Sequence, residues 1–189
     1  MRIISGKAKG QRLKVPKGQA LRPTAARVKE ALFDILPHDL SGRKVLDLFA
    51  GTGNLSLEAL SRGAAEVVLV DRSRNAVQAI RDNLRRLGFT EKASVWAAPV
   101  LKSLRALARR GRKFNLVFLD PPYEKGIVKS AMRILGEIDL LEEDGVVIVE
   151  HSVREEIDAS YGKLALRDQR RYGATALSFF GPRPAQQPE

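Results

Sequence analysis

The segment FLDPPYEKG, residues 118–126, places several reactive groups directly after a run of apolar residues. Pro121 and Pro122 have no N–H to give to a sheet ladder, so the strand expected here must end at Asp120. The Asp120 carboxylate and the Pro121 carbonyl are hydrogen-bond acceptors, and the proline rings fix the direction of that carbonyl. Tyr123 adds a flat aromatic face. Together these groups could hold the N–H groups of an amine whose planar ring stacks on the tyrosine.

A second candidate site is the glycine-rich segment DLFAGTGNLS, which begins at Asp47. Gly51 and Gly53 would let the backbone turn tightly and approach a ligand closely. Asp71 ends the next apolar run, twenty residues after Gly51, which is the spacing at which an acid reaches ribose hydroxyls. A dinucleotide fits this segment poorly, because Ser56 replaces the third glycine of the dinucleotide fingerprint and Asp47 would repel a pyrophosphate.

A cationic ligand that carries a ribose suits the glycine-rich segment better. S-adenosylmethionine has an ammonium and a sulfonium charge, which Asp47 would attract, and a ribose, which Asp71 could bind. The alternative is a structural glycine turn in which Asp71 only caps a helix. The segment therefore predicts either an S-adenosylmethionine site or a turn without a ligand, and the strand end at Asp120 favours the first.

Strands and helices alternate from residue 43 onward, and this order must position both segments. Apolar runs predict strands over 44–49, 66–71, 93–98, 114–120 and 145–151. Helical spacing predicts helices over 54–63, 73–88, 100–111 and 128–138. A closing antiparallel hairpin is expected over 163–181. This order predicts a doubly wound, mostly parallel α/β sheet, in which ligands bind beyond the carboxyl ends of the strands.

The N-terminal residues precede this alternating pattern. Two β-prone runs, residues 3–4 and 13–15, flank a GKAKG turn and predict a hairpin. A helix is expected over residues 22–36, with Thr24 as its N-cap. We expect this extension to lie outside the core that the alternating strands and helices build.

The formal net charge of +11 is unevenly distributed. Residues 1–30 contain nine Lys or Arg and one acid, and residues 101–113 contain six Lys or Arg and no acid. Such clusters attract polyanions, chiefly nucleic acid, although a basic surface that only maintains solubility would have the same composition. The chain has no cysteine, two histidines and no apolar run suited to a membrane or a leader, so we expect a cytoplasmic protein without a metal site.

The DPPY sequence at residues 120–123 resembles the (D/N)PP(Y/F/W) motif of amino-group methyltransferases. The chain as a whole resembles the RsmD-type family, the small-subunit ribosomal RNA guanine-N2 methyltransferases of bacteria. Four segments carry this resemblance, in the family's order: LRPTAARVKEALFDIL, DLFAGTGNLSLEALSRGA, FLDPPYEKG and RRYGATALSFF. The match covers nearly the whole chain, from Arg2 to about Phe180.

The resemblance implies a class I, Rossmann-like methyltransferase fold with a seven-stranded sheet and S-adenosylmethionine as the methyl donor. It implies that the acceptor is the exocyclic N2 amine of a guanine in small-subunit ribosomal RNA, met within a partly or fully assembled subunit. We expect a monomer. On this interpretation residues 1–40 are an RNA-contacting extension, 41–181 the S-adenosylmethionine-dependent methyltransferase domain, and 182–189 a disordered tail.

The candidate site residues fall into three groups. The catalytic group comprises Asp120, Pro121, Pro122 and Tyr123. The cofactor-binding group comprises Asp47, Phe49, Ala50, Gly51, Gly53, Asp71, Arg72, Ala98, Val100 and Asp120. The substrate-binding group comprises Arg2, Lys7, Lys9, Arg12, Arg22, Thr24, Arg27 and Tyr123.

One position departs from the family pattern. Such enzymes often have an acid or an amide after the third strand, near the adenine amine, whereas this chain has Pro99. Adenine recognition would then depend on backbone groups of Ala98 and Val100. Trp96 could lie near the adenine but is better explained as a core residue.

Two further places have open interpretations. Arg22, Thr24 and Arg27 could bind RNA phosphates or close over the cofactor, or they could form only the start of a helix. His151 stands at the end of the fifth predicted strand and is expected to enter a loop rather than to act in catalysis.

Other functions would use similar residues. A DNA or RNA adenine-N6 methyltransferase would use the same DPPY chemistry, although readers of duplex DNA usually carry an added recognition domain, for which the sequence shows no segment. A non-catalytic RNA-binding assembly module could retain the same fold. A nicotinamide-dependent dehydrogenase is disfavoured by Ser56 and Asp47.

Overall fold

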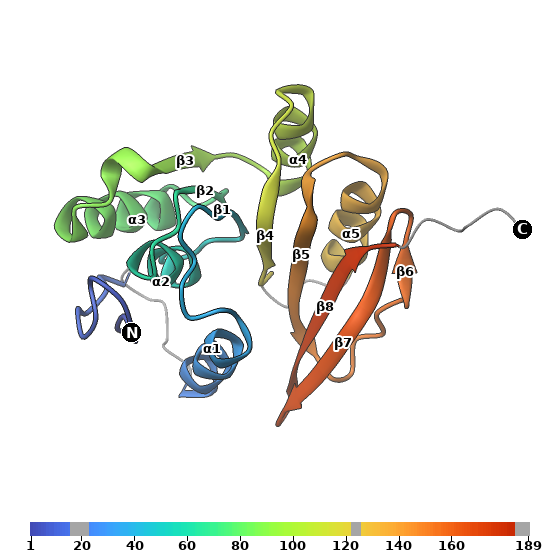
Figure 1. The fold of residues 1–189 in the computed structure, drawn as a ribbon, viewed down its shortest axis with the longest axis horizontal. Helices are drawn as coiled ribbons and strands as arrows, with labels where there is room; N and C mark the ends of the chain where they lie inside the picture. Colours follow the sequence, from blue (N-terminus) through green and yellow to red (C-terminus); the bar gives the residue numbers. More distant parts are fainter. Residues whose placement is uncertain (16–22, 122–125, 184–189) are drawn as a thin grey trace, which may run out of the picture.

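One sheet of eight strands organises the chain, in the order β3-β2-β1-β4-β5-β8-β7-β6 (Figure 1). The structure is a computed structural model that describes residues 1–15, 23–121 and 126–183. The strands are β1 (Lys44–Leu48), β2 (Glu66–Asp71), β3 (Ala93–Ala97), β4 (Phe114–Leu119), β5 (Leu141–Ser152), β6 (Ser160–Tyr161), β7 (Leu164–Tyr172) and β8 (Thr175–Pro182). The helices are α1 (Pro23–Ile35), α2 (Asn54–Ser61), α3 (Arg74–Leu87), α4 (Val100–Arg109) and α5 (Ile127–Glu137), with a short 3₁₀ turn at Thr90–Lys92.

The centre of the sheet is parallel and its C-terminal side is antiparallel. Strands β3, β2, β1, β4 and β5 pair in parallel, whereas β8 pairs antiparallel with β5 and β7. The predicted fold class, with its closing hairpin, is confirmed. The expected seven strands become eight because the two-residue strand β6 pairs with the start of β7, and a run this short leaves no periodicity in the sequence.

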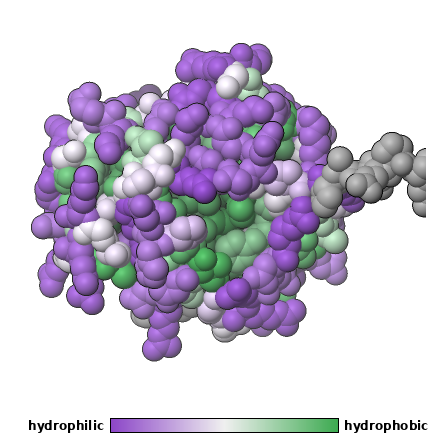
Figure 2. Space-filling model, in the orientation of Figure 1, coloured by the Kyte–Doolittle hydropathy of each residue, from purple (hydrophilic) through white to green (hydrophobic). Residues whose placement is uncertain are grey.

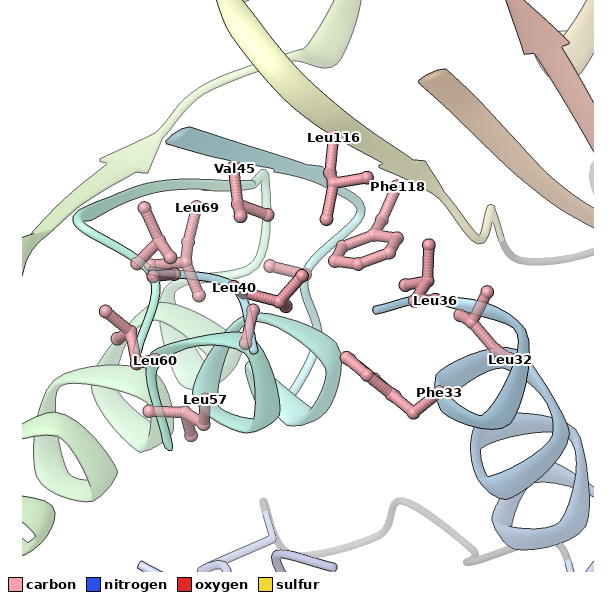
Figure 3. Packing of buried hydrophobic residues seen from close by; sticks show 14 of the residues in the cluster. Leu32, Phe33, Leu36, Leu40, Val45, Leu57, Leu60, Leu69, Leu116 and Phe118 are labelled. Atoms are coloured by element: carbon pink, nitrogen blue, oxygen red, sulfur yellow. The ribbon is translucent and has the colours of Figure 1, made fainter. Parts of the chain in front are cut away.

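Successive residues of each central strand face opposite layers of helices. In β1, Val45 belongs to a cluster with buried residues of α1, α2 and α3, which we call the α1–α3 cluster. Leu46 and Leu48 belong to a second cluster with residues of α4 and α5, the α4–α5 cluster. Phe33 of α1 packs against Phe118 of β4 in the α1–α3 cluster, with ring centroids 6.1 Å apart (Figure 3). Burial on both faces explains why these strands are almost continuously apolar.

The face of the molecule seen in Figure 2 is largely hydrophilic. Figure 2 shows hydrophobic residues gathered near the centre of the viewed face, with hydrophilic side chains around them. No helix among the described residues combines the length and the apolar character that a membrane span requires.

The N-terminal segment is built into the core. Residues 1–13 form the expected hairpin, closed by the Leu13 N–H, which donates to the Met1 carbonyl (3.0 Å). Ile3, Ala8 and Leu13 are buried in the α1–α3 cluster. The expectation that this extension lies outside the core is therefore wrong, since its apolar residues and those of the sheet share one cluster. The division of function at residue 40 stays a prediction.

Glu58 of α2 joins three parts of the chain and is fully buried. Its carboxylate accepts hydrogen bonds from the backbone N–H groups of Ile4 (2.8 Å) and Ser5 (3.0 Å). It also pairs with Lys29 Nζ of α1 (2.8 Å) and with Arg62 Nε at the end of α2 (3.1 Å). One side chain therefore attaches the N-terminal hairpin and α1 to α2.

Burial works against the charge of Glu58, yet the ion pair with Lys29 and the surrounding donors lower its pKa. The pKa of Lys29 is lowered by burial, against the attraction of Glu58. Lys29 Nζ also donates to the Arg2 carbonyl (3.1 Å) and to Asn54 Oδ1 (2.7 Å). The network therefore reaches Asn54, the first residue of α2, directly after the glycine-rich segment.

We expect Glu58→Gln to destabilise the fold strongly. The amide keeps the shape but leaves the buried Lys29 and Arg62 without a counter-charge, which typically costs about 3–5 kcal/mol. Glu66→Gln is the matched control, because Glu66 pairs with Arg112 (2.5 Å) where both side chains are about a third exposed. Loss of this partly exposed ion pair should lower the free energy of unfolding by no more than about 1 kcal/mol. Urea unfolding measures both variants, and equal small losses would contradict the role assigned to Glu58.

Candidate active site

The register of the central strands brings the predicted site residues to one edge of the sheet. Leu48 of β1 pairs with Val70 of β2 on one side and with Leu119 of β4 on the other. The residues that follow these three positions come level at the carboxyl edge: Phe49, Asp71 and Asp120. Ligands of doubly wound folds bind beyond this edge. The parallel pairing therefore unites the two segments that the sequence singled out.

Asp47 lies just below this edge and is only 2% exposed. Its Oδ2 accepts a hydrogen bond from Ser56 Oγ (2.8 Å), so the serine that replaces a fingerprint glycine has a definite partner. Burial and, to a smaller extent, the nearby charges of Asp120 and Asp71 together raise the pKa of Asp47 to about 7, against the hydrogen bond from Ser56. Asp47 thus belongs to a cluster of carboxylates that repel one another.

The glycine-rich segment adopts a tight turn between β1 and α2. Gly51 and Gly53 have positive φ angles of 55° and 76°, and the Gly53 N–H donates to the Ala50 carbonyl (2.7 Å). A Cβ atom on Gly53 would lie 3.2 Å from Leu69 Cδ2, so the turn also packs closely. Phe49 has a φ of 66°, which for a side chain other than glycine costs about 1–3 kcal/mol. Such strain is typical of ligand-binding loops.

Asp71 connects two loops of the carboxyl edge. Its Oδ2 accepts from the Gly51 N–H (2.9 Å) and its Oδ1 from the Ser73 N–H (2.8 Å). Ser73 is the N-cap of α3, where its side chain accepts from the Ala76 N–H (3.3 Å). Asp71 therefore organises the start of α3 and the glycine-rich turn. Each carboxylate oxygen can accept a second hydrogen bond, which leaves room for the hydroxyls of a ribose. Ribose binding by Asp71 stays a prediction.

Asp120 is exposed immediately after the buried strand β4, and Pro121 is buried behind it. Asp120 is therefore accessible from the carboxyl edge, whereas Pro121 packs into the interior. The predicted catalytic residues Pro122 and Tyr123 lie outside the described residues.

The predicted adenine side of the site lies after β3. The Ala98 N–H donates to the Asp71 carbonyl (3.1 Å), and Val100 begins α4 with Pro99 as its N-cap. Arg72 is exposed next to Asp71. The structure places these residues at the carboxyl edge, while their contacts with an adenine stay a prediction.

The predicted substrate-binding residues do not gather at one place. Arg2 and Arg12 form an isolated antiparallel β-bridge through their backbones in the hairpin, and both residues are exposed. Lys7 lies at the far end of α2, where its N–H donates to the Ser61 carbonyl (2.8 Å), and the exposed Lys9 follows two residues later. Arg27 is exposed on α1. The hairpin thus extends along α2 away from the carboxyl edge.

The start of the first helix differs from the sequence prediction. Helix α1 begins at Pro23, so Thr24 lies within the helix and the prediction of Thr24 as its N-cap is wrong. Proline is well suited to the first position of a helix, because it has no N–H to satisfy there. Arg22 and the side chain of Thr24 lie outside the described part of the chain, so their predicted role in substrate binding is a proposal.

Asn83 of α3 is a structural residue of the site that the sequence analysis missed. Its buried amide accepts from the Lys14 N–H (2.7 Å) and donates to the carbonyls of Lys14 (3.0 Å) and Thr52 (3.3 Å). It therefore holds the hairpin against the glycine-rich turn. A signal was present, because Asn83 lies beside Leu84 and three residues after Ile80 on the apolar face of α3.

His151 lies within β5 and is buried, so the expectation that it enters a loop is wrong. Its ring contacts Ser178 Oγ through Nε2 (2.8 Å) and the Ser152 carbonyl through Nδ1 (2.9 Å). Burial lowers its pKa. These contacts give His151 a role in pairing β5 with β8.

The carboxyl edge offers hydrogen-bond acceptors and negative charge. Among the described residues, no group of three or more His, Cys, Asp or Glu side chains is placed to hold a metal ion. A cation bound beside Asp47, Asp71 and Asp120 would oppose the burial and the neighbouring negative charges that together raise the pKa of Asp47. The ammonium, sulfonium and ribose of S-adenosylmethionine fit this combination of charge and acceptors.

We expect Asp47→Asn to change how stability depends on pH. Because the folded-state pKa of about 7 lies above the ordinary value of 3.8, the native wild type holds an extra proton between these values and loses stability as the pH rises through them. Relative to the wild type, the variant should therefore gain a few kcal/mol between about pH 4 and 8, at about 1.4 kcal/mol per pKa unit. Urea unfolding across this range measures the difference.

Asp82→Asn is the matched control for this titration. Hydrogen bonds from Lys14 and Gln78 lower the pKa of Asp82 to about 2, so its contribution is lost only as the pH falls towards that value. Above about pH 4, the free energy of unfolding of the Asp82 variant should change with pH in the same way as that of the wild type. Parallel stability curves for Asp47→Asn and the wild type between about pH 4 and 8 would contradict the raised pKa of Asp47.

Comparisons with known proteins agree with this geometry. "Putative rRNA methyltransferase YlbH" of Bacillus subtilis (strain 168) is 38% identical over 183 residues, which cover 97% of this chain and 100% of the relative. "Ribosomal RNA small subunit methyltransferase D" of Escherichia coli (strain K12) is 33% identical over 180 residues, which cover 95% of this chain and 89% of the relative.

A solved structure and a family model match over similar lengths. The structure of "Putative methyltransferase yhhF from Escherichia coli" superposes with a TM-score of 0.84 at 31% identity, over 98% of this chain and 99% of the other. The family model described as "Conserved hypothetical protein 95" matches residues 1–181. Given this match and the two relatives, the chain belongs to the Conserved hypothetical protein 95 family, which is the RsmD-type family.

Proposed function

We propose that this protein is an S-adenosylmethionine-dependent methyltransferase that modifies the exocyclic N2 amine of a guanine in small-subunit ribosomal RNA. The observation that carries the proposal is the level arrangement of Asp71 and Asp120 across β1, beside the buried Asp47. Family membership supports the reaction class, since the relatives named above are methyltransferases of ribosomal RNA. A partly or fully assembled subunit in the cytoplasm is the proposed setting, and the protein is proposed to act as a monomer.

The cofactor would lie over the glycine-rich turn. Gly51 and Gly53 give the backbone its tight turn, Asp71 presents acceptors to the ribose, and Asp47 supplies negative charge from below. Backbone groups near Ala98 and Val100 would face the adenine. When bound, S-adenosylmethionine supplies a methyl group on a positively charged sulfur, which leaves as a neutral thioether.

The catalytic turn would activate a poor nucleophile. The lone pair of a guanine N2 amine is delocalised into the ring, so its nitrogen attacks a methyl group only weakly. The exposed Asp120 carboxylate and the Pro121 carbonyl would each accept one hydrogen bond from the amine. This favours a pyramidal nitrogen, whose lone pair can point at the methyl group. Because β4 and the buried Pro121 hold the turn, these acceptors would be preorganised. Stacking of the unstacked guanine on Tyr123 is proposed from the sequence.

An adenine-N6 methyltransferase would use the same acceptors and is the competing function. The family match favours ribosomal RNA over DNA, while the choice of base depends on the pocket that receives it. Incubation with labelled S-adenosylmethionine and undermethylated small subunits, followed by mapping of the modified nucleotide, tests the proposal. Label on a guanine N2 is the expected result. Label on an adenine, or transfer to DNA only, would overturn it.

We expect Asp120→Ala to lower the rate of methyl transfer by at least about a hundredfold, a loss typical of a removed transition-state acceptor. The affinity for S-adenosylmethionine should change much less, because the turn at residues 49–53 is intact. Asp168→Asn, which removes an exposed acid paired with Arg170 on the closing hairpin, is the control and should keep its activity. Near-normal turnover in Asp120→Ala would refute the catalytic role.

A further inference from the structure

We propose that helix α4 is a second RNA-binding surface, which contacts phosphates on the face of the sheet opposite to the N-terminal hairpin. This inference rests on the proposed function, because it names how the same substrate would lie on the protein. The sequence has a basic cluster here that neither the cofactor site nor the catalytic turn uses.

The composition of α4 separates its two sides. Among the helices of residues 1–15, 23–121 and 126–183, α4 alone contains no Asp or Glu. Its buried side includes Leu104 and Leu107. Lys102, Arg105 and Arg109 are exposed and spaced by three and four residues, so they share one side of the helix. The helix therefore presents a basic stripe to solvent.

Acids of the described residues leave this stripe unneutralised. No described acid forms an ion pair with Lys102, Arg105 or Arg109. The contrast is α3, where Lys14 of the hairpin and Arg85 both pair with Asp82. Like charges held together on a rigid helix repel one another, and a polyanion relieves that repulsion.

Acids near the end of α4 are already engaged. Glu66 pairs with Arg112 (2.5 Å), and Asp139 pairs with Lys113 (3.0 Å). These pairs compensate the basic residues that follow the helix, which leaves the charge on α4 itself without a partner in the described part of the chain.

Arg110 extends the stripe towards the edge strand β3. Its guanidinium carbon lies 4.9 Å from the centre of the Trp96 ring, and the residue is exposed. A guanidinium that rests on an indole loses little conformational freedom when it binds, and its planar donors suit phosphate oxygens. Arg110 is thus better prepared than a free side chain to meet a phosphate.

The position of α4 suits a substrate that reaches the catalytic edge. Ala97 of β3 pairs with Asp71, so α4 begins just beyond the level of the cofactor site and then leads away from it. At 1.5 Å per residue, Lys102 and Arg109 lie about 10 Å apart along the helix. The start of α4 is therefore the part of the stripe that lies nearest to the carboxyl edge. Helix α4 lies at the top of Figure 1 and the N-terminus at the lower left, and they pack in different hydrophobic clusters.

Phosphates fit this surface better than a protein partner does. The centre of a protein interface is usually apolar, whereas Met1 is the only large hydrophobic side chain exposed among the described residues, and it lies in the hairpin. The region over α4 in Figure 2 is mainly hydrophilic. A stripe of cations without an exposed large apolar side chain among the described residues is the pattern expected for contacts with an RNA backbone.

The test replaces Lys102, Arg105 and Arg109 together by Gln, which forms helices about as well. Binding to protein-free small-subunit RNA and to undermethylated subunits is measured at several salt concentrations. If each side chain meets a phosphate, the slope of log affinity against log salt should flatten by about two to three units, at about 0.7–0.9 per contact. The affinity for S-adenosylmethionine and the urea midpoint should stay at the wild-type values.

Two further variants make the result specific. Arg154, Lys163 and Arg171 are exposed and form no ion pair within the described residues. Their joint replacement by Gln removes the same amount of charge from another part of the surface. This control variant should leave the slope of log affinity against log salt nearly unchanged. Arg105→Lys with Arg109→Lys keeps the charge of the stripe and should retain most of the slope.

The outcomes separate the inference from the proposed function. An unchanged slope in the α4 triple variant, or an equal loss in the control triple variant, overturns the α4 surface while methylation by the wild type still supports the function. A loss with assembled subunits but not with protein-free RNA identifies a protein partner and also overturns it. If the wild type neither binds nor methylates small-subunit RNA, the proposed function fails first and the inference fails with it.

Discussion

The burial of the Asp47 carboxyl group beside Asp71 and Asp120 is the constraint on which the candidate site depends. Parallel pairing of β1 with β2 and β4 brings Asp71 and Asp120 level, and Asp47 is buried just below them. The cost of this arrangement is visible in the pKa of Asp47, which burial and the two neighbouring charges raise to about 7. A site of this kind favours a cationic ligand over an anionic one, which separates a sulfonium cofactor from a dinucleotide on the same fold.

The rest of the structure holds that edge in place. Asp71 joins the glycine-rich turn to the start of α3, and Asn83 joins the same turn to the N-terminal hairpin. Glu58 and Lys29 then connect the hairpin and α1 to the beginning of α2. The hairpin, which the sequence suggests as a separate arm, is thus coupled to the cofactor turn through buried polar contacts.

The sequence predicts most of the framework because its signals are local. Alternating apolar runs and glycines at helix ends identify β1 to β5 and α2 to α5, and the strand ends locate Asp71 and Asp120. Long-range contacts leave weaker signals. Lys29 lies between Val28 and Leu32 on α1, so its burial is compatible with the pattern, but its partner Glu58 cannot be identified from spacing. The positive φ angle of Phe49 likewise cannot be predicted from the sequence, since an aromatic residue gives no indication of a left-handed backbone conformation.

The claim that the carboxyl edge is a cation site is tested most directly by proton release on cofactor binding. Calorimetry of S-adenosylmethionine binding near pH 7, in buffers with different ionisation enthalpies, counts the protons released by the wild type and by Asp47→Asn. A bound cation lowers the raised pKa of Asp47, so the wild type should release a fraction of a proton that the variant does not. Equal proton release by the two proteins, or proton uptake by the wild type, would contradict the account.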